Sequence, residues 1–146
     1  MAKRIALLLV LGVMAGFTIA SAQEADAIVG RWYTEDQKAL VEIYNEAGVY
    51  NGRIVWLKES TNEDGTEKKD RNNPDPALQQ RPLIGLNLVA GFSHQGGERW
   101  SGGSIYDPDN GKTYSCKMTL TNDTLKVRGF VGVSLFGRTT VWQRAE

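Results

Sequence analysis

Side chains able to do catalytic chemistry are scarce in this sequence and do not form a recognised set. Among 146 residues there are one histidine and one cysteine, whereas a zinc site usually needs several such ligands. His94 lies in a loop-like segment, no Gly-x-Ser-x-Gly elbow supplies a nucleophile, and Gly132–Gly137 has the wrong spacing for one. No glycine-rich phosphate loop follows a strand. The sequence therefore predicts no enzyme, no metal and no cofactor, with carboxylates from distant strands meeting inside a barrel as the open alternative.

Aromatic side chains are the more informative group, because they fall on strand-like runs. The candidate ligand-binding residues are Trp32, Trp56, Trp100, Tyr106, Tyr114 and Arg128. Two interpretations stay open. Large aromatic side chains commonly pack a core, since each buries a large apolar area. Alternatively, they line an apolar cavity in which a few polar groups, such as Arg128 or Tyr114, orient a small lipid-like ligand.

A long polar segment, Lys58–Gln80, contains carboxylates that invite comparison with a calcium site. Its acidic residues include Glu63, Asp64, Glu67 and Asp70. Their spacing does not match the EF-hand loop, and Lys68 and Lys69 lie among them. We therefore expect a solvated loop here, in which Asp75 caps a single helical turn that begins at Pro76.

Short strands must position all of these residues, and the clearest pair lies within Glu98–Leu120. Two runs flank Asp107–Gly111, a segment made of turn residues. The second run alternates strictly, with Tyr114, Cys116, Met118 and Leu120 on one face. A period of two with one apolar face is typical of a half-buried antiparallel strand. Cys116 is therefore expected to be a buried thiol.

Similar runs precede and follow this hairpin. They are Val29–Thr34, Leu40–Tyr44, Val49–Leu57, Leu86–Phe92, Thr124–Val131 and Arg138–Arg144. Gly52 inside the third run indicates a bulge or bend. About eight short strands with tight turns predict an all-β, antiparallel barrel or sandwich. An eight-stranded barrel is either filled by side chains or holds one small ligand.

The first 22 residues have the pattern of a secretory signal peptide. Lys3 and Arg4 precede the apolar run Ile5–Ile19, and Ala20–Ala22 offers small residues for cleavage. The apolar run is short for a membrane anchor, which needs about 20 residues. We therefore expect residues 1–22 to be removed, residues 23–146 to form a single periplasmic or secreted domain, and no membrane span to follow cleavage.

The charge of that domain excludes one class of partner. It would carry 15 basic and 17 acidic side chains. A net charge of this sign predicts no basic field able to hold nucleic acid or an anionic membrane surface.

Short motifs spread over nearly the whole predicted domain form a further pattern. They are Gly30–Trp32, Gly52–Trp56, Asp70, Asn73–Pro74, Arg81–Leu83, Gly85, Trp100, Gly103–Pro108, Gly111–Tyr114, Leu125, Arg128–Gly129 and Gly137–Arg144. With these motifs the chain resembles a family of small exported bacterial proteins known only as domain of unknown function 2147. The resemblance implies a lipocalin-like barrel of the bacterial envelope with no established activity. The Gly-x-Trp opening is also similar to the first-strand motif of lipocalins.

The two ends of the domain carry a pair suited to closing an up-and-down barrel, in which the first and last strands are neighbours. Trp32 would then need a cover at one barrel end. An arginine from the last strand suits this role, because its planar guanidinium stacks on an indole. Arg144 is the first choice for this contact and Arg138 the second.

Two classes of function follow for such a domain. One is a periplasmic binder of a small apolar ligand. The alternative is a non-enzymatic envelope interaction or structural module with a filled core, which meets a protein partner through its long loop or a strand edge. An internal cavity of a few hundred Å³ would favour the binder, and a filled core would favour the module.

Overall fold

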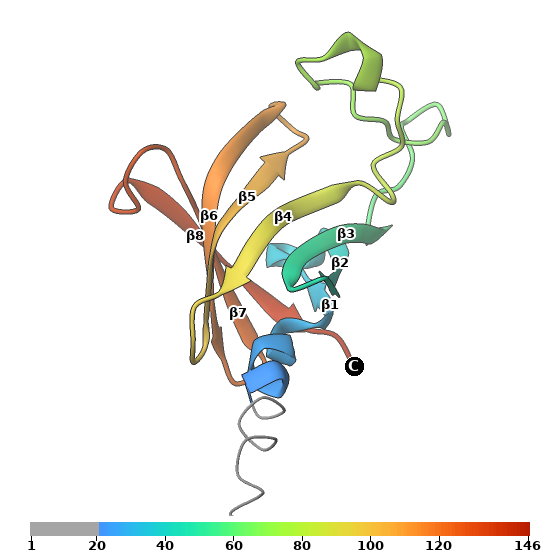
Figure 1. Ribbon diagram of the computed structural model, residues 1–146. Helices are drawn as coiled ribbons and strands as arrows, with labels where there is room; N and C mark the ends of the chain where they lie inside the picture. The colour runs from blue at the N-terminus through green and yellow to red at the C-terminus, as the bar shows by residue number, and fades with distance from the viewer. Residues whose placement is uncertain (1–20) are drawn as a thin grey trace, which may run out of the picture.

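The computed structural model describes residues 21–146, which form one closed β-barrel (Figure 1). Its strands are β1 (Gly30–Tyr33), β2 (Ala39–Glu46), β3 (Val49–Leu57), β4 (Asn87–His94), β5 (Arg99–Asp107), β6 (Lys112–Thr121), β7 (Thr124–Phe130) and β8 (Gly137–Arg144). Each strand pairs antiparallel with the next, and β1 pairs with β8 to close the ring. The predicted all-β, up-and-down barrel is therefore confirmed. The predicted signal peptide, apart from its last two residues, lies outside the described residues.

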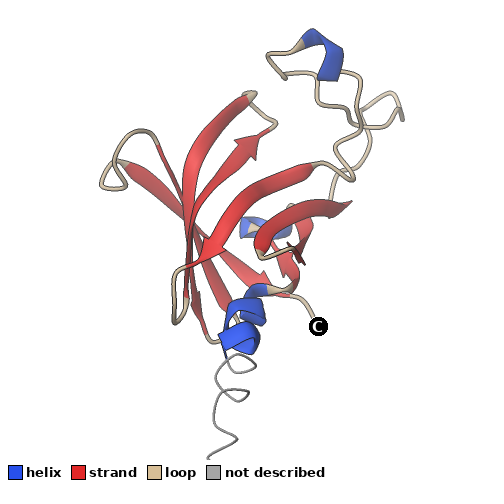
Figure 2. Cartoon of the chain, in the orientation of Figure 1, coloured by secondary structure: helices blue, strands red, loops and turns tan. Residues whose placement is uncertain are grey.

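Within residues 21–146, helix is confined to short segments outside the barrel wall (Figure 2). The chain is helical at residues 21–25 and forms the 3-10 turns η1 (Asp26–Ile28), η2 (Glu35–Gln37) and η3 (Pro76–Leu78). The carboxylate of Asp75 accepts a hydrogen bond of 3.0 Å from the amide of Ala77, which confirms the predicted cap of η3. Across residues 21–146, no helix has the length and apolar character needed to cross a membrane.

Alternation along the strands gives the barrel its apolar interior. On β6, Cys116, Met118 and Leu120 are buried, as the sequence pattern predicts. Burial raises the pKa of the Cys116 thiol to about 12, so this cysteine is a protonated core side chain rather than a reactive thiolate. Gly52 lies where the register between β3 and β4 shifts. A Cβ atom there would meet Val89 at 2.6 Å, which explains the glycine by close packing.

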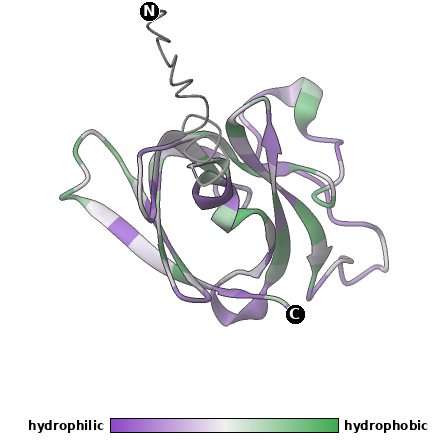
Figure 3. Cartoon of the chain, turned by 60° about the horizontal axis from the view of Figure 1, so that its bottom comes forward, coloured by the Kyte–Doolittle hydropathy of each residue, from purple (hydrophilic) through white to green (hydrophobic). Residues whose placement is uncertain are grey.

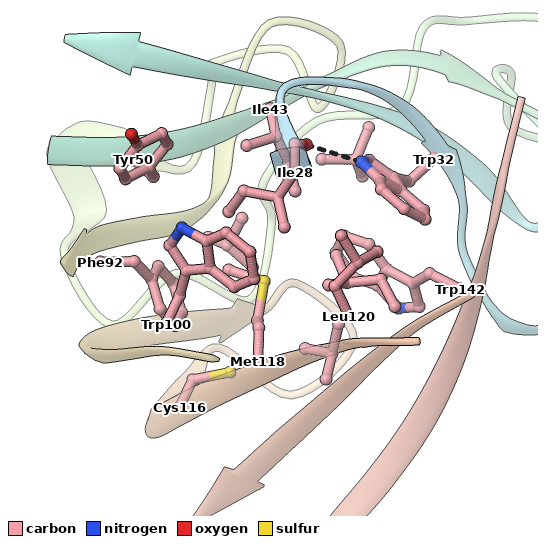
Figure 4. Close-up of a cluster of buried hydrophobic side chains, with 14 residues drawn as sticks. Ile28, Trp32, Ile43, Tyr50, Phe92, Trp100, Cys116, Met118, Leu120 and Trp142 are labelled. Atoms are coloured by element: carbon pink, nitrogen blue, oxygen red, sulfur yellow. Dashed lines mark hydrogen bonds between the residues drawn. The ribbon is translucent and has the colours of Figure 1, made fainter. Parts of the chain in front are cut away.

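One end of the barrel is closed by the segment that precedes β1. Residues 25–29 cross this end, which faces the viewer in Figure 3. The indole nitrogen of Trp32 donates to the carbonyl of Ile28 at 2.9 Å, and that of Trp100 donates to the carbonyl of Ala25 at 3.1 Å. Figure 4 shows Trp32, Trp100 and Trp142 packed around Ile28 in one cluster. This half of the barrel is a solid core.

Candidate functional site

The other half of the barrel opens into a cavity of about 1010 Å³, a volume that includes the space between the loops at its mouth. It lies at the end where the β1–β2, β3–β4, β5–β6 and β7–β8 connections gather. Its apolar wall includes Ala39, Ile54, Leu88, Ile105, Val127 and Trp142. Val127 and Trp142 also belong to the core cluster of the closed end, so they form the boundary between filled core and cavity. The volume is at the upper end of the roughly 300–1,000 Å³ usual for ligand pockets.

Two of the predicted ligand-binding residues, Tyr106 and Tyr114, line this cavity. Tyr114 shares the inward face of β6 with Cys116 and pairs with Ile105 across the β5–β6 ladder. Its hydroxyl accepts a hydrogen bond of 3.0 Å from the side-chain amide of Asn110, a residue of the turn at the cavity mouth. Tyr114 therefore presents an anchored phenol ring to the cavity.

Trp32 and Trp100, in contrast, lie in the closed half of the barrel. Both are essentially inaccessible, and neither lines the cavity. Their indole N–H groups are already bonded to the carbonyls of Ile28 and Ala25. The segment before β1 fills the space around them, so these two tryptophans serve as core.

Trp56 and Arg128 lie on the outer surface of the barrel. Trp56 pairs with Leu40 on β2, is 42% exposed, and packs edge-on against Tyr33. Arg128 binds the β7–β8 connection: its Nε donates to the carbonyl of Ser134 at 2.7 Å and its Nη2 to that of Leu135 at 3.3 Å. On β3 the register shift between the pairs Leu40–Trp56 and Val41–Ile54 turns Trp56 outward. On β7 alternation with the buried Val127 turns Arg128 outward. Neither side chain lines the cavity.

The mouth of the cavity is polar and carries both signs of charge. Its charged residues are Glu35, Asp36, Lys38, Lys58, Glu59, Lys68, Asp107, Asp109 and Arg138. Two ion pairs lie at the mouth, Arg138 with Glu35 at 3.1 Å and Lys68 with Glu59 at 3.5 Å. An apolar interior below a charged rim suits a molecule with an apolar body and a polar end.

The long β3–β4 connection is fastened to the cavity wall by one buried carboxylate. Asp70 is fully buried, and its Oδ2 accepts from the side-chain amide of Asn73 and from Arg81 Nε, each at 2.8 Å. Its Oδ1 accepts from the hydroxyl of Tyr106. We call these four residues, Asp70, Asn73, Arg81 and Tyr106, the loop clasp. Tyr106 thus lines the cavity and holds the connection in place.

The electrostatics of the loop clasp favour the charged form of Asp70. Burial by itself would raise the pKa of this carboxyl group, but the hydrogen bonds from Tyr106, Asn73 and Arg81 and the guanidinium charge together lower it. Burial and the neighbouring carboxylate raise the pKa of Tyr106 to about 12. Asp70 is therefore occupied by protein donors and is not available as the calcium ligand considered from the sequence. Within residues 21–146 no cluster of three His, Cys, Asp or Glu side chains could hold a metal ion.

Several cavity residues lie outside the set singled out from the sequence. Val127, Thr140 and Trp142 form part of the wall, from β7 and β8. The alternation of β7 already places Val127 on an inward face, and the same rule applied to β8 would have found Thr140 and Trp142. Alternation gives the face of a residue, however, and not its depth along the barrel.

Comparison with known proteins agrees with this architecture. A family model described as "Uncharacterized protein conserved in bacteria (DUF2147)" matches residues 30–144. A solved structure similar to this chain is protein HP1028 from the human pathogen Helicobacter pylori, which belongs to the lipocalin family. The two share 23% sequence identity with a TM-score of 0.71, over 82% of this chain and 83% of that chain. No curated protein matches the chain.

Proposed function

The chain belongs to the DUF2147 family of bacterial proteins, and we propose that it binds a small apolar ligand in the open half of its lipocalin-like barrel. The observation that carries the proposal is the cavity of about 1010 Å³. Its apolar wall would take the body of the ligand, and its charged mouth would take a polar end. Tyr114 supplies aromatic contact surface on the cavity wall, and the buried Trp142 lies beneath that wall at the boundary with the core.

The alternative, an envelope module with a filled core, has less support. Only the closed half of the described barrel is filled, and pairing of β1 with β8 closes the sheet into a ring. Binding without catalysis is also part of the proposal. The titratable groups of the loop clasp are bonded to one another, and the thiol of Cys116 is buried.

Export to the periplasm completes the proposed function. It rests on the signal-like pattern of residues 1–22 and on the resemblance to an exported family. Amino-terminal sequencing of the protein from its host should begin at Gln23. Intact Met1 on cytoplasmic protein would contradict export.

Tryptophan fluorescence provides the test of binding, because Trp142 lies at the boundary between the core and the cavity. Titration with a panel of apolar probes, including a long-chain fatty acid, should give a saturable change for at least one. Native mass spectrometry of protein purified from its host should detect a bound small molecule. The absence of a saturable change across the panel, together with a ligand-free mass, would reject the proposal.

A further inference from the structure

The loop that joins β7 to β8 exposes an unusual amount of apolar side chain. Residues 131–136 include Val131, Val133, Leu135 and Phe136, whose exposed fractions are 72%, 59%, 79% and 75%. In Figure 3 this loop is the green segment that projects from the left of the barrel. Exposed apolar side chains clustered in this way mark an interaction site rather than ordinary surface. We call residues 131–136 the apolar tip.

The apolar tip stands at the mouth of the cavity. Val131 and Phe136 contribute to the cavity lining, whereas Val133 and Leu135 do not. The tip is therefore both part of the opening and a projection beyond it. Whatever the tip contacts lies next to the opening through which a ligand would pass.

Several backbone groups of the tip form hydrogen bonds with other groups of the protein. Arg128 donates to the carbonyls of Ser134 and Leu135, and the amide of Phe136 donates to the carbonyl of Val133 at 3.2 Å. Lys117 binds the hydroxyl of Ser134 at 3.2 Å. Unpaired backbone groups are what makes a loop costly to place in an apolar medium. These bonds reduce that cost and leave the apolar side chains facing outward.

Strands β6 to β8, which adjoin the tip, hold more basic than acidic side chains, and two of the cations are paired, Arg138 with Glu35 and Arg144 with Asp123. Residues 112–144 contain six basic side chains and one acidic one, whereas residues 23–111 contain nine basic and fifteen acidic ones. Lys117 and Arg128 are register partners on the outer face of β6 and β7, and Lys126 lies one step beyond, opposite Thr119. The only acid among residues 112–144, Asp123, is in the β6–β7 turn at the closed end.

We propose that the apolar tip docks the protein on an anionic lipid surface, with the outer face of β6 and β7 beside the tip, where Lys117 and Arg128 lie, turned toward the headgroups. Apolar side chains enter the boundary between headgroups and acyl chains, and flanking cations attract the negative headgroups. A stable protein interface buries about 800 Å² on each partner, more than a six-residue tip supplies by itself. Charge segregation together with a narrow apolar projection therefore favours a lipid surface over a second copy of the chain.

Vesicle flotation of the protein cleaved after Ala22 tests this docking. Vesicles of phosphatidylethanolamine and phosphatidylglycerol at 3:1 should carry the protein upward, phosphatidylcholine vesicles should carry much less, and added salt should weaken the binding. Val133→Ser combined with Leu135→Ser should reduce binding to the anionic vesicles at least ten-fold. The matched control is Val49→Ser, which alters an exposed apolar side chain at the closed end and should change binding less than two-fold.

A second variant reports insertion directly. Leu135→Trp places an indole on the tip, and its fluorescence should be quenched by vesicles that contain bromine-labelled acyl chains, more strongly than that of the unaltered protein. Equal quenching would overturn the proposal, as would failure to float with anionic vesicles or equal flotation of the double serine variant. A dimer in solution that the double serine variant converts to monomer, without vesicle binding, would show instead that a second copy covers the tip.

Failure of docking and failure of ligand binding are distinguishable. Val133 and Leu135 do not line the cavity, so the double serine variant should bind an apolar probe in solution as the unaltered protein does. Loss of vesicle binding with probe binding retained supports docking by the tip. Loss of both would show that the tip acts through the cavity and would overturn a separate docking role.

Discussion

The guanidinium of Arg144 lies over the indole of Trp32, with its Cζ atom 4.2 Å from the ring centroid. The two residues are register partners where β8 meets β1, so this contact seals the seam of the barrel. Arg144 also donates to the carbonyl of Ala27 at 2.7 Å, which ties the segment before β1 to the last strand. Gly30 makes room, because a Cβ atom there would lie 3.2 Å from the Arg144 side chain. The predicted cover of Trp32 by Arg144 is thereby confirmed.

Replacement of Arg144 by alanine should lower the free energy of unfolding by roughly 1–2 kcal/mol, the scale of a partly desolvated cation–π contact plus a hydrogen bond. Denaturant titration measures this loss. A double-mutant cycle with Trp32→Phe should show coupling between the two sites. Arg138→Ala is the control: Arg138 shares the face of Arg144 but lies at the cavity mouth in an exposed ion pair with Glu35, and its loss should be nearly silent. Strict additivity of the Arg144 and Trp32 changes would contradict the contact.

Gly111→Ala should destabilise the packing of the long connection onto the β5–β6 turn. Gly111 has φ +72°, and a Cβ atom there would overlap the carbonyl of Asn72. The positive φ alone costs about 1–2 kcal/mol. Gly48→Ala is the matched control, since it has φ +85° but open space around it. Limited proteolysis within residues 58–86 should accelerate for Gly111→Ala only, and equal rates for the two variants would show that the overlap is relieved.

The loop clasp should make stability depend on acid. Because the pKa of Asp70 is lowered in the folded protein, the unfolded chain binds the proton more readily, and the contribution of Asp70 is present above about pH 4 and lost as pH falls further. Asp70→Asn removes a charge-assisted hydrogen bond and should cost roughly 1.5–3 kcal/mol at neutral pH. Denaturant titrations from pH 7 to pH 2 should show the gap between the two proteins closing below pH 4. A gap independent of pH would indicate that Asp70 acts through shape alone.

Filling the cavity should abolish ligand binding without unfolding the barrel. Thr140 lines the cavity, and Thr140→Phe would occupy part of its volume. Val141, the next residue, is 37% exposed, so Val141→Phe adds similar bulk outside the cavity wall. The affinity for an apolar probe should fall at least ten-fold for Thr140→Phe and stay within two-fold for Val141→Phe. Equal affinities for the two variants would place the probe outside the cavity.

Whether a feature could be predicted from the sequence depends on how many residues separate the groups that form it. The strict alternation of Tyr114 to Leu120 and the cap at Asp75 are local, because each depends on backbone geometry within a few residues. Both were predicted correctly. The contact of Trp32 with Arg144 is distant in sequence, yet barrel closure makes the two strands neighbours, so it too could be predicted.

The depth of a side chain along the barrel axis was decided only by the tertiary structure. Trp100 and Tyr114 both face inward, but one lies beside the segment before β1 and the other in the cavity. That difference depends on register and bulges between strands and on which barrel end the preceding segment closes. Asp70 likewise became a buried clasp because Tyr106, 36 residues further along, meets it at the rim.

The sequence and the fold also determine different aspects of the charge of the protein. The sequence determined a net charge near zero for the predicted mature domain, from which no basic surface was expected. The excess of cations in residues 112–144 is itself a feature of the sequence, and the fold places these cations on the adjoining strands β6, β7 and β8. A net charge adds every side chain with equal weight, whereas the field at a surface depends on which charges lie within a Debye length of it.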